Sequence, residues 1–169
     1  MKVLVIGNGA RENAICWKLK QSNQIAALFC APGNPGISRV AECVDINVSE
    51  IEKLAEFAKN ENIDLTVVGP ELPLSLGIVD LFRSKNLRIF GPTKDASLIE
   101  ASKDFAKNLM MEAGVPTAKF ESVNSKDELK KTLKNWELPF VLKADGLAAG
   151  KGVVICKTDT EVQNAVEFL

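Results

Sequence analysis

A glycine-rich segment near the carboxyl end of the chain carries two lysines between two apolar stretches. Lys143 and Lys151 flank a segment that includes Gly146 and Gly150, and Gly152 follows directly. Lysine ammonium groups and the backbone amides of glycine-rich segments are groups that hold nucleotide phosphates. The segment is not a P-loop, because three residues rather than four separate its first two glycines and Gly152 replaces the Ser or Thr of that motif. We therefore predict a flexible glycine-rich flap between antiparallel strands that covers a polyphosphate; the alternative interpretation of Lys143 is an ordinary surface lysine.

Four short turns in the first part of the chain each follow a predicted β-strand. Because the carboxyl ends of parallel strands line one ligand crevice, these turns should meet at one edge of a sheet. Their sequences are Gly7-Asn8-Gly9, Pro32-Gly33-Asn34, Gly69-Pro70-Glu71 and Gly91-Pro92-Thr93. The first turn precedes a predicted helix, so its backbone N–H groups should lie bare at a positive helix end and form a phosphate cradle. Arg11 could add a charge-assisted, bidentate contact to that phosphate.

The first turn also matches the start of a dinucleotide-binding fingerprint, but two features disfavour that function. Glu12 stands where the third glycine is needed, and Phe29-Cys30-Ala31 stands where an acidic residue would hold a ribose. We therefore expect a ligand other than NAD. The sequence leaves two interpretations of Glu71 open, a contact to a ligand hydroxyl and a solvated loop carboxylate.

The composition is that of a globular protein that works without histidine. The 169 residues are 46% hydrophobic and 25% charged, and the absence of histidine excludes Ser-His-Asp catalysis, Cys-His catalysis and histidine-ligated metals. A net charge of −1 predicts no general attraction to nucleic acid or to an anionic membrane. No apolar run approaches the ~20 residues that span a bilayer. The 4 cysteines lack CxxC spacing, so we expect buried free thiols in a cytoplasmic protein.

Alternating strands and helices must position the four turns. Apolar runs that end at turn residues predict strands at residues 2–6, 25–30, 64–68 and 87–90. Apolar positions at helical spacing predict helices at residues 11–21, after an N-cap at Ser49, and at residues 74–85. This alternation indicates an open α/β sheet with parallel strands and right-handed crossovers.

The pattern changes after Thr93, and we place a domain boundary near residue 100. The expected elements are helices at 94–101 and 103–113, a strand at 117–122, a helix at 126–136, strands at 140–143 and 152–156, and a final helix. This order is typical of the beginning of an α+β domain. The final helix has an apolar face that needs a partner, formed by Val162, Ala165, Val166 and Leu169, so we expect the chain to be the first part of a longer protein.

Six segments, in order along the chain, resemble the glycinamide ribonucleotide synthetase family, the phosphoribosylamine–glycine ligases of the ATP-grasp superfamily. They are residues 5–14, 31–36, 67–74, 90–94, 102–107 and 143–153, the last of which resembles the family's flap. The resemblance covers nearly the whole chain. It implies an open, parallel, Rossmann-like N domain that binds substrate (residues 1–100), followed by a linker helix and the truncated start of an ATP-grasp domain (residues 101–169).

The resemblance also implies a reaction of purine biosynthesis and its binding residues. ATP would phosphorylate the carboxylate of glycine, and the amine of 5-phosphoribosylamine would attack the acyl phosphate to give glycinamide ribonucleotide, with Mg²⁺ or Mn²⁺ neutralising the transferring group. ATP would contact Lys103, Lys143, Gly146, Gly150, Lys151 and Gly152. The phosphoribosyl substrate would contact Asn8, Gly9, Arg11, Gly33, Asn34, Gly36 and Glu71. No catalytic residue and no metal ligand is expected within these residues.

Two residues depart from the family's pattern. Ala10 replaces the second glycine of a pair and adds a methyl group where the backbone approaches the ligand, and Asn13 replaces a histidine. Because family members are more than twice as long, we expect this chain alone to be an inactive fragment of the ligase. Two alternatives stay open, another ATP-grasp carboxylate–amine ligase and a non-catalytic nucleotide-binding module. The sequence leaves the oligomeric state open.

Overall fold

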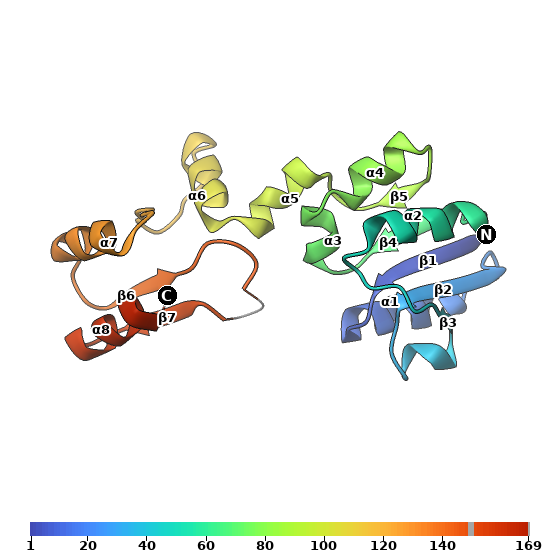
Figure 1. Cartoon of the computed structure of the whole chain (residues 1–169), viewed down its shortest axis with the longest axis horizontal. Coiled ribbons are helices and arrows are strands. Elements are labelled where there is room, and N and C mark those ends of the chain that lie inside the picture. Colours follow the sequence, from blue (N-terminus) through green and yellow to red (C-terminus); the bar gives the residue numbers. More distant parts are fainter. Residues whose placement is uncertain (149–150, 169) are drawn as a thin grey trace. The chain divides into compact units, whose positions relative to one another are not determined.

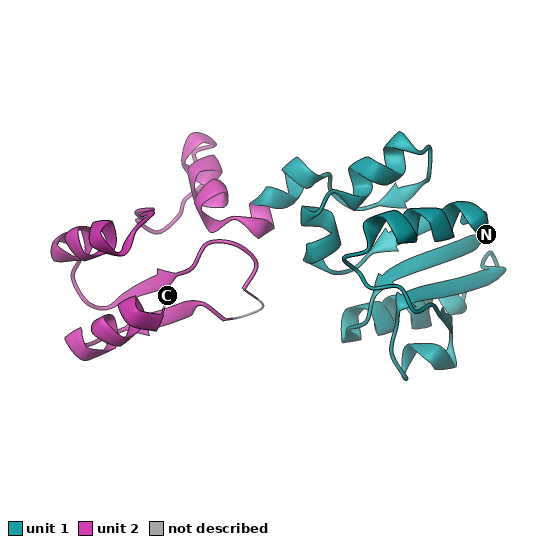
Figure 2. Ribbon diagram, viewed as in Figure 1, with its two compact units in different colours: residues 1–98 teal, residues 99–169 magenta. Residues whose placement is uncertain are grey.

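A computed structural model of the chain describes residues 1–148 and 151–168. These residues form two compact units, Met1–Leu98 and the residues from Ile99 onwards (Figure 2). Helix α5 (Lys94–Ala101) contains the boundary between them.

The first unit is an open sheet of five parallel strands in the order β3-β2-β1-β4-β5 (Figure 1). The strands are β1 (Lys2–Gly7), β2 (Ala27–Pro32), β3 (Glu42–Cys43), β4 (Leu65–Val68) and β5 (Ile89–Phe90). The connections contain α1 (Ala10–Lys20), the 3₁₀ helix η1 (Ile37–Arg39), α2 (Ile51–Asn60), α3 (Glu71–Ser75) and α4 (Ile78–Ser84). The predicted α/β class with parallel strands is therefore confirmed.

Alternating side chains of the central strand β1 supply both layers of the core. Leu4 and Ile6 are completely buried on the face covered by α2 and α4. Val3 and Val5 are buried on the opposite face, against Cys16 of α1. A strand buried on both faces reads as a continuous apolar run, which is why the sequence predicted β1 so directly.

The structure corrects several predicted boundaries in this unit. The strand expected at residues 25–30 lies at Ala27–Pro32, and the two-residue strand β3 was not predicted. The N-cap of α2 is Glu50, not Ser49, whose hydroxyl instead donates to Asn47 Oδ1. The helix expected at residues 74–85 is two helices, α3 and α4, because the backbone turns left-handed at Gly77 (φ 90°).

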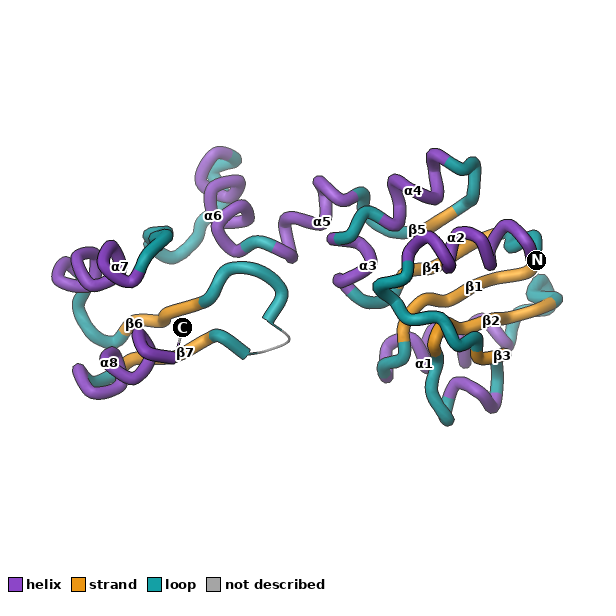
Figure 3. Tube along the Cα trace, in the orientation of Figure 1, coloured by secondary structure: helices purple, strands orange, loops and turns teal. Residues whose placement is uncertain are grey.

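The second unit begins with helices and continues into a two-stranded antiparallel sheet (Figure 3). Its elements are α6 (Lys103–Glu112), α7 (Lys126–Thr132), η2 (Leu133–Asn135), β6 (Phe140–Lys143), β7 (Val153–Cys156) and α8 (Asp159–Phe168). The strand expected at residues 117–122 is an irregular segment, and the helix expected at 126–136 becomes a 3₁₀ turn after Thr132. The antiparallel pairing of β6 with β7 confirms the predicted strands on either side of the glycine-rich segment.

The core of the second unit lies on one face of the β6–β7 hairpin. Phe140 and Cys156, which are register partners, are buried against Ala165 of α8. Ala165 and Val166, two members of the predicted apolar face of the last helix, are therefore buried, whereas Leu169 lies outside the described residues.

All four cysteines are free thiols, as predicted, but they are not all buried. Cys16, Cys30 and Cys156 are buried, and Cys43 is exposed because β3 is an edge strand. Within the described residues, no helix combines the length and the apolar character needed to cross a membrane.

Candidate functional site

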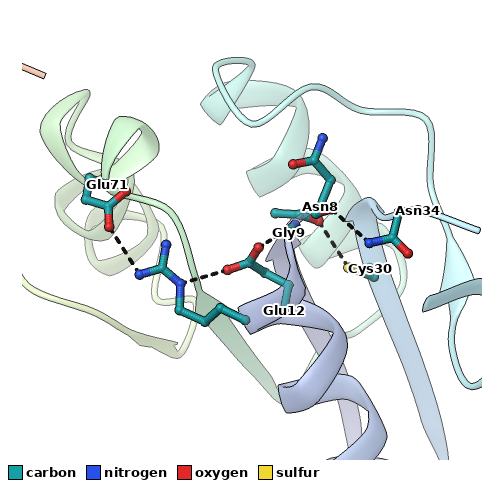
Figure 4. Close-up of polar contacts among 8 residues, drawn as sticks. Asn8, Gly9, Glu12, Cys30, Asn34 and Glu71 are labelled. Carbon is teal, nitrogen blue, oxygen red and sulfur yellow. Dashed lines mark hydrogen bonds and ion pairs between the residues drawn. The ribbon is translucent and has the colours of Figure 1, made fainter. Parts of the chain in front are cut away.

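Three of the four predicted turns are joined by hydrogen bonds at the carboxyl edge of the sheet. The amide of Gly33 donates to Gly7 O (3.2 Å), and the amide of Gly69 donates to Ile6 O (3.0 Å). The side-chain amide of Asn34 donates to Asn8 O at 2.8 Å (Figure 4). The turns after β1, β2 and β4 therefore line one edge, as expected for the carboxyl ends of parallel strands.

The turn after β2 is held rigid by the side chain of Asn34. Its Oδ1 accepts from the amides of Gly36 (2.7 Å) and Ile37 (2.9 Å), while its Nδ2 reaches Asn8. Gly33 has φ +74°, and a side chain there would collide with the sulfur of Cys43. The predicted residues Gly33, Asn34 and Gly36 thus form one preorganised loop beside the first turn.

The start of α1 differs from the bare phosphate cradle that the sequence predicted. The amide of Gly9 donates to Oε2 of Glu12 at 2.6 Å, so this N–H group is already bonded within the protein. Glu12 is a buried side chain in the first turn of the helix. The prediction of freely available amides at this helix end was therefore wrong at Gly9, because a carboxylate three residues further on satisfies it.

Arg11 connects two of the turns through a pair of carboxylates. Its Nε donates to Glu12 Oε1 (3.0 Å) and its Nη1 to Glu71 Oε1 (3.1 Å). The hydrogen bond to Glu71 makes the largest contribution to raising the pKa of Arg11 above its ordinary value, and the hydrogen bond to Glu12 makes the next largest. The backbone amide of Glu71 itself, followed by Arg11, lowers the pKa of the Glu71 carboxyl. The guanidinium is thus held at the carboxyl edge of the sheet, between Glu12 of α1 and Glu71 after β4.

Glu71 and Asn13 also take definite places at this edge. Glu71 is the first residue of α3, and its carboxylate is paired with Arg11 although 44% of its side chain is exposed. Asn13, one of the two departures from the family's pattern, lies next to Gly36, where a side chain would meet its Nδ2. Ala10, the other departure, is the exposed first residue of α1.

In the second unit, Asp145 ties the glycine-rich segment to the start of α6. Its Oδ1 accepts from the amide of Lys103 (2.6 Å), and its Oδ2 accepts from the hydroxyl of Ser102 (2.9 Å). Burial alone would raise the pKa of Asp145, but these hydrogen bonds outweigh it and lower the pKa. The ammonium of Lys103 then donates to Gly146 O at 2.8 Å. Lys103 and Gly146, both predicted to contact ATP, are therefore adjacent.

The open face of the β6–β7 hairpin places a lysine beside exposed apolar side chains. Lys143 pairs in register with Val153, and Val141 pairs with Ile155. All four side chains are exposed and alternate along the strands with the buried residues of the core. Lys151 is exposed and Gly152 adopts φ +71°, whereas Gly150 lies outside the described residues. The hairpin therefore presents an apolar platform that ends in a cation.

Three functional features escaped the sequence analysis. Glu12 was recognised only as a missing glycine, and neither the link from Asp145 to Lys103 nor the apolar platform of the hairpin was predicted. The available signal for the platform was that residues 153–156 are all apolar, so a strand with one face in the core must expose apolar side chains on the other. No local signal pairs Asp145 with a helix start 42 residues away.

Comparison with known proteins places the whole chain in one family. The model of the phosphoribosylglycinamide synthetase N domain matches residues 1–100, and that of the ATP-grasp (A) domain of the same protein matches residues 101–169. Phosphoribosylamine–glycine ligases of Caldanaerobacter subterraneus and Ralstonia nicotianae are 52% and 47% identical over 169 residues. The chain spans 40% of the length of each of these relatives.

Solved structures agree with this fold. The phosphoribosylamine–glycine ligase of Thermotoga maritima is 28% identical with a TM-score of 0.75, over 98% of this chain and 38% of that one. An ADP complex of N5-carboxyaminoimidazole ribonucleotide synthetase has a TM-score of 0.80 at 17% identity, over 98% of this chain and 43% of that one, which shows a shared fold.

The match to an ATP-grasp (A) domain model, over the unit that follows the open parallel sheet, assigns the chain to the ATP-grasp class of proteins. Within that class, the chain belongs to the phosphoribosylglycinamide synthetase family. The resemblance inferred from the six sequence segments is thus confirmed.

Proposed function

We propose that this chain supplies the sugar-phosphate crevice and part of the nucleotide site of a phosphoribosylamine–glycine ligase. In the proposed reaction, ATP phosphorylates the glycine carboxylate, and the amine of 5-phosphoribosylamine displaces phosphate to give glycinamide ribonucleotide and ADP. The reaction runs in the cytoplasm, a reducing compartment in which the four free thiols persist. The reaction of the curated relatives and the six matching segments support this proposal.

The observation that carries the proposal is the hydrogen-bonded cluster of the turns after β1, β2 and β4 at the carboxyl edge of the sheet, which we interpret as the expected crevice. Arg11 provides the charge for a phosphate, and Glu71 provides a carboxylate suited to ribose hydroxyls. Asn8, Gly9, Gly33, Asn34 and Gly36 complete the proposed substrate set on the adjoining turns. The proposed phosphate ligand, Arg11, and the proposed hydroxyl ligand, Glu71, lie next to each other. The site therefore suits a small ligand that carries both groups, such as a sugar phosphate.

The nucleotide half of the proposal rests on the second unit. The apolar platform of Val141, Val153 and Ile155 suits the flat face of a base, and Lys143 at its end suits a phosphate. Lys103, beside Gly146, is the second proposed phosphate ligand, together with Gly150, Lys151 and Gly152. The ADP and MgADP complexes among structures of this fold support a nucleotide as a ligand of the fold.

The proposed metal is Mg²⁺ or Mn²⁺, brought with the nucleotide phosphates. Residues 1–148 and 151–168 bring no three His, Cys, Asp or Glu side chains together as a metal site. These residues therefore do not fit a protein-built cage for the metal, and we assign none of them as a ligand. Their part is to bind and orient the two phosphorylated substrates.

A thermal-shift comparison of glycinamide ribonucleotide with NAD tests the crevice. A ligand at about 100 times its Kd stabilises the folded state by about 2.7 kcal/mol, which raises the Tm by several degrees. We expect the ribonucleotide to raise the Tm and NAD to leave it unchanged. The Arg83→Gln variant, which alters an exposed arginine of α4, should respond like the wild type, whereas Arg11→Gln should not respond.

Two results would contradict the proposal. A shift with NAD and none with the ribonucleotide would indicate a dinucleotide site. An unchanged response in Arg11→Gln would mean that the ribonucleotide binds elsewhere. The ATP site is tested by a separate thermal-shift measurement, because the proposed ATP ligands lie in the second unit. ATP should raise the Tm of the wild type and not that of Lys143→Gln.

A further inference from the structure

Glu12 is a buried carboxylate whose role the proposed reaction does not explain. Only 4% of its side chain is exposed, although it lies in the first turn of α1 at the crevice. One carboxylate oxygen accepts from the amide of Gly9 and the other from Nε of Arg11 (Figure 4). A buried charge is costly unless it is paired and hydrogen-bonded, so these two contacts define what this residue does.

Three glycines from two different turns enclose this carboxylate. A Cβ added at Gly7, at Gly9 or at Gly69 would collide with the carboxyl group of Glu12. Gly7 and Gly9 belong to the turn after β1, whereas Gly69 belongs to the turn after β4. The backbone is therefore shaped around the carboxylate, which is a built feature of the crevice rather than an incidental surface acid.

The first consequence concerns which anion the crevice accepts. Dinucleotide-binding proteins bring their diphosphate against the backbone at the second glycine of the Gly7-x-Gly9-x-x-Gly pattern, which is Gly9 here, whereas Glu12 stands where they have the third glycine. Here the amide of Gly9 is already bonded, and a negative charge lies at that helix end. A diphosphate bound as in dinucleotide-binding proteins needs that amide and would lie directly against the Glu12 carboxylate, so it is disfavoured there, whereas a single phosphate can bind to the guanidinium of Arg11 instead.

The second consequence concerns Arg11. Glu12 holds the Nε edge of its guanidinium, and Nη1 extends to Glu71 at 3.1 Å. A guanidinium fixed at one edge presents its remaining N–H groups in a defined direction, which suits a single phosphate. We propose that Glu12 is a positioning residue with two effects, an inference that rests on the proposed sugar-phosphate function. It orients Arg11 toward a single phosphate group, and it prevents a diphosphate from binding at the start of α1.

Ribose 5-phosphate and ADP-ribose form a matched pair of probes, because the second contains the first in a diphosphate linkage. We expect the wild-type chain to bind ribose 5-phosphate at least tenfold more tightly than ADP-ribose in calorimetric titrations. In Glu12→Gln, which keeps the size but removes the charge, this preference should fall at least tenfold. Glu56→Gln, an exposed acid of α2, is the control and should keep the wild-type preference.

The orientation of the Arg11 side chain is tested without any ligand, from the rate at which its Nε proton exchanges with water in ¹H–¹⁵N NMR spectra. The bond to Glu12 should slow this exchange in the wild type and in Glu71→Gln, and the exchange should be fast in Glu12→Gln. Glu12→Asp keeps the charge but shortens the reach. In Glu12→Asp the Arg11 Nε proton should exchange fast, while ADP-ribose should still bind more weakly than ribose 5-phosphate. This variant therefore separates the positioning of Arg11 from the exclusion of a diphosphate.

Equal preference in the wild type and in Glu12→Gln would overturn the exclusion of diphosphates. Equally fast exchange of the Arg11 proton in both would overturn the positioning role. A wild-type chain that binds neither probe would refute the proposed sugar-phosphate function and the exclusion with it, while the exchange measurement still decides the positioning role.

Discussion

Asp145 shows how one carboxylate links a glycine-rich segment to a helix. It accepts hydrogen bonds from the amide of Lys103 and the hydroxyl of Ser102, both at the start of α6. Negative charge is favourable at a helix N-terminus, where backbone amides lack partners within the helix. The same contacts bring the Lys103 ammonium to Gly146 O, so one residue fixes two proposed phosphate ligands.

The lowered pKa of Asp145 predicts how the stability of the second unit depends on pH. A carboxyl whose pKa is lower when folded stabilises the fold above its unfolded pKa, and this contribution disappears as pH falls through the lower folded value. The ordinary value is 3.8, so the loss should begin near that pH and continue below it. We expect Asp145→Asn to cost about 1 kcal/mol at pH 7, as helix-end contacts typically do, and progressively less as the pH falls below 3.8.

Urea unfolding between pH 2.5 and pH 7 measures this difference through the fluorescence of Trp136. The Trp17→Phe substitution removes the other of the 2 tryptophans, which lies exposed in α1. Glu137→Gln, at an exposed loop residue, is the control and should show no such pH-dependent difference. A difference between Asp145→Asn and the wild type that stays constant with pH would contradict the assigned role.

At the scale of elements, the break between α3 and α4 sets the position of Glu71. The amide of Gly77 donates to Leu74 O and ends α3, and Gly77 O accepts from the amide of Leu81 in α4. Its φ of 90° lies in the left-handed region, which glycine adopts without strain. A continuous helix over these residues would remove the short α3 that begins at Glu71.

Gly77→Ala should therefore destabilise the first unit by about 1–2 kcal/mol, the cost of a left-handed conformation for alanine. The added Cβ would meet Lys94 Cδ at 3.5 Å, an ordinary contact, so the backbone conformation accounts for the loss. Gly77→Asn should cost less, because asparagine tolerates this conformation. Urea unfolding followed by Trp17 fluorescence in a Trp136→Phe background provides the comparison, and equal losses in both variants would argue against a conformational cause.

For the whole molecule, two separate cores of unequal size hold the two units. The first unit has buried clusters on both faces of its sheet. The cluster of the second unit contains three buried residues, Phe140, Cys156 and Ala165. Since burial of apolar surface is the main favourable contribution to folding, the second unit should be the less stable one.

We therefore expect two unfolding transitions rather than one. Trp136 fluorescence should change at a lower urea concentration than Trp17 fluorescence, each measured with the other tryptophan replaced by Phe. Glycinamide ribonucleotide should raise only the Trp17 midpoint, because all of its proposed ligands lie in the first unit. Coincident midpoints in all conditions would show that the chain unfolds as one cooperative unit.

Local patterns in the sequence determined the parallel sheet, the four turns at its carboxyl edge and the hairpin of β6 and β7. The continuous apolar runs of β1 and β7 and the glycines near the strand ends are local signals. The family followed from six such segments in order. The shortest strand, β3, and the break at Gly77 were missed, because a two-residue strand has no periodicity and an isolated glycine does not reveal its backbone angle.

Only the tertiary structure decided which residues of the candidate site form hydrogen bonds and ion pairs with one another. Arg11 meets Glu71 across 60 residues, and Asp145 meets Lys103 across 42. Glu12 became a buried anchor because folding brought the turn after β4 against its carboxylate. Such contacts depend on which strands become neighbours and on which polar groups burial deprives of water. The sequence alone therefore identifies the residues of the candidate site, whereas their hydrogen-bond partners are determined by the packing of the fold.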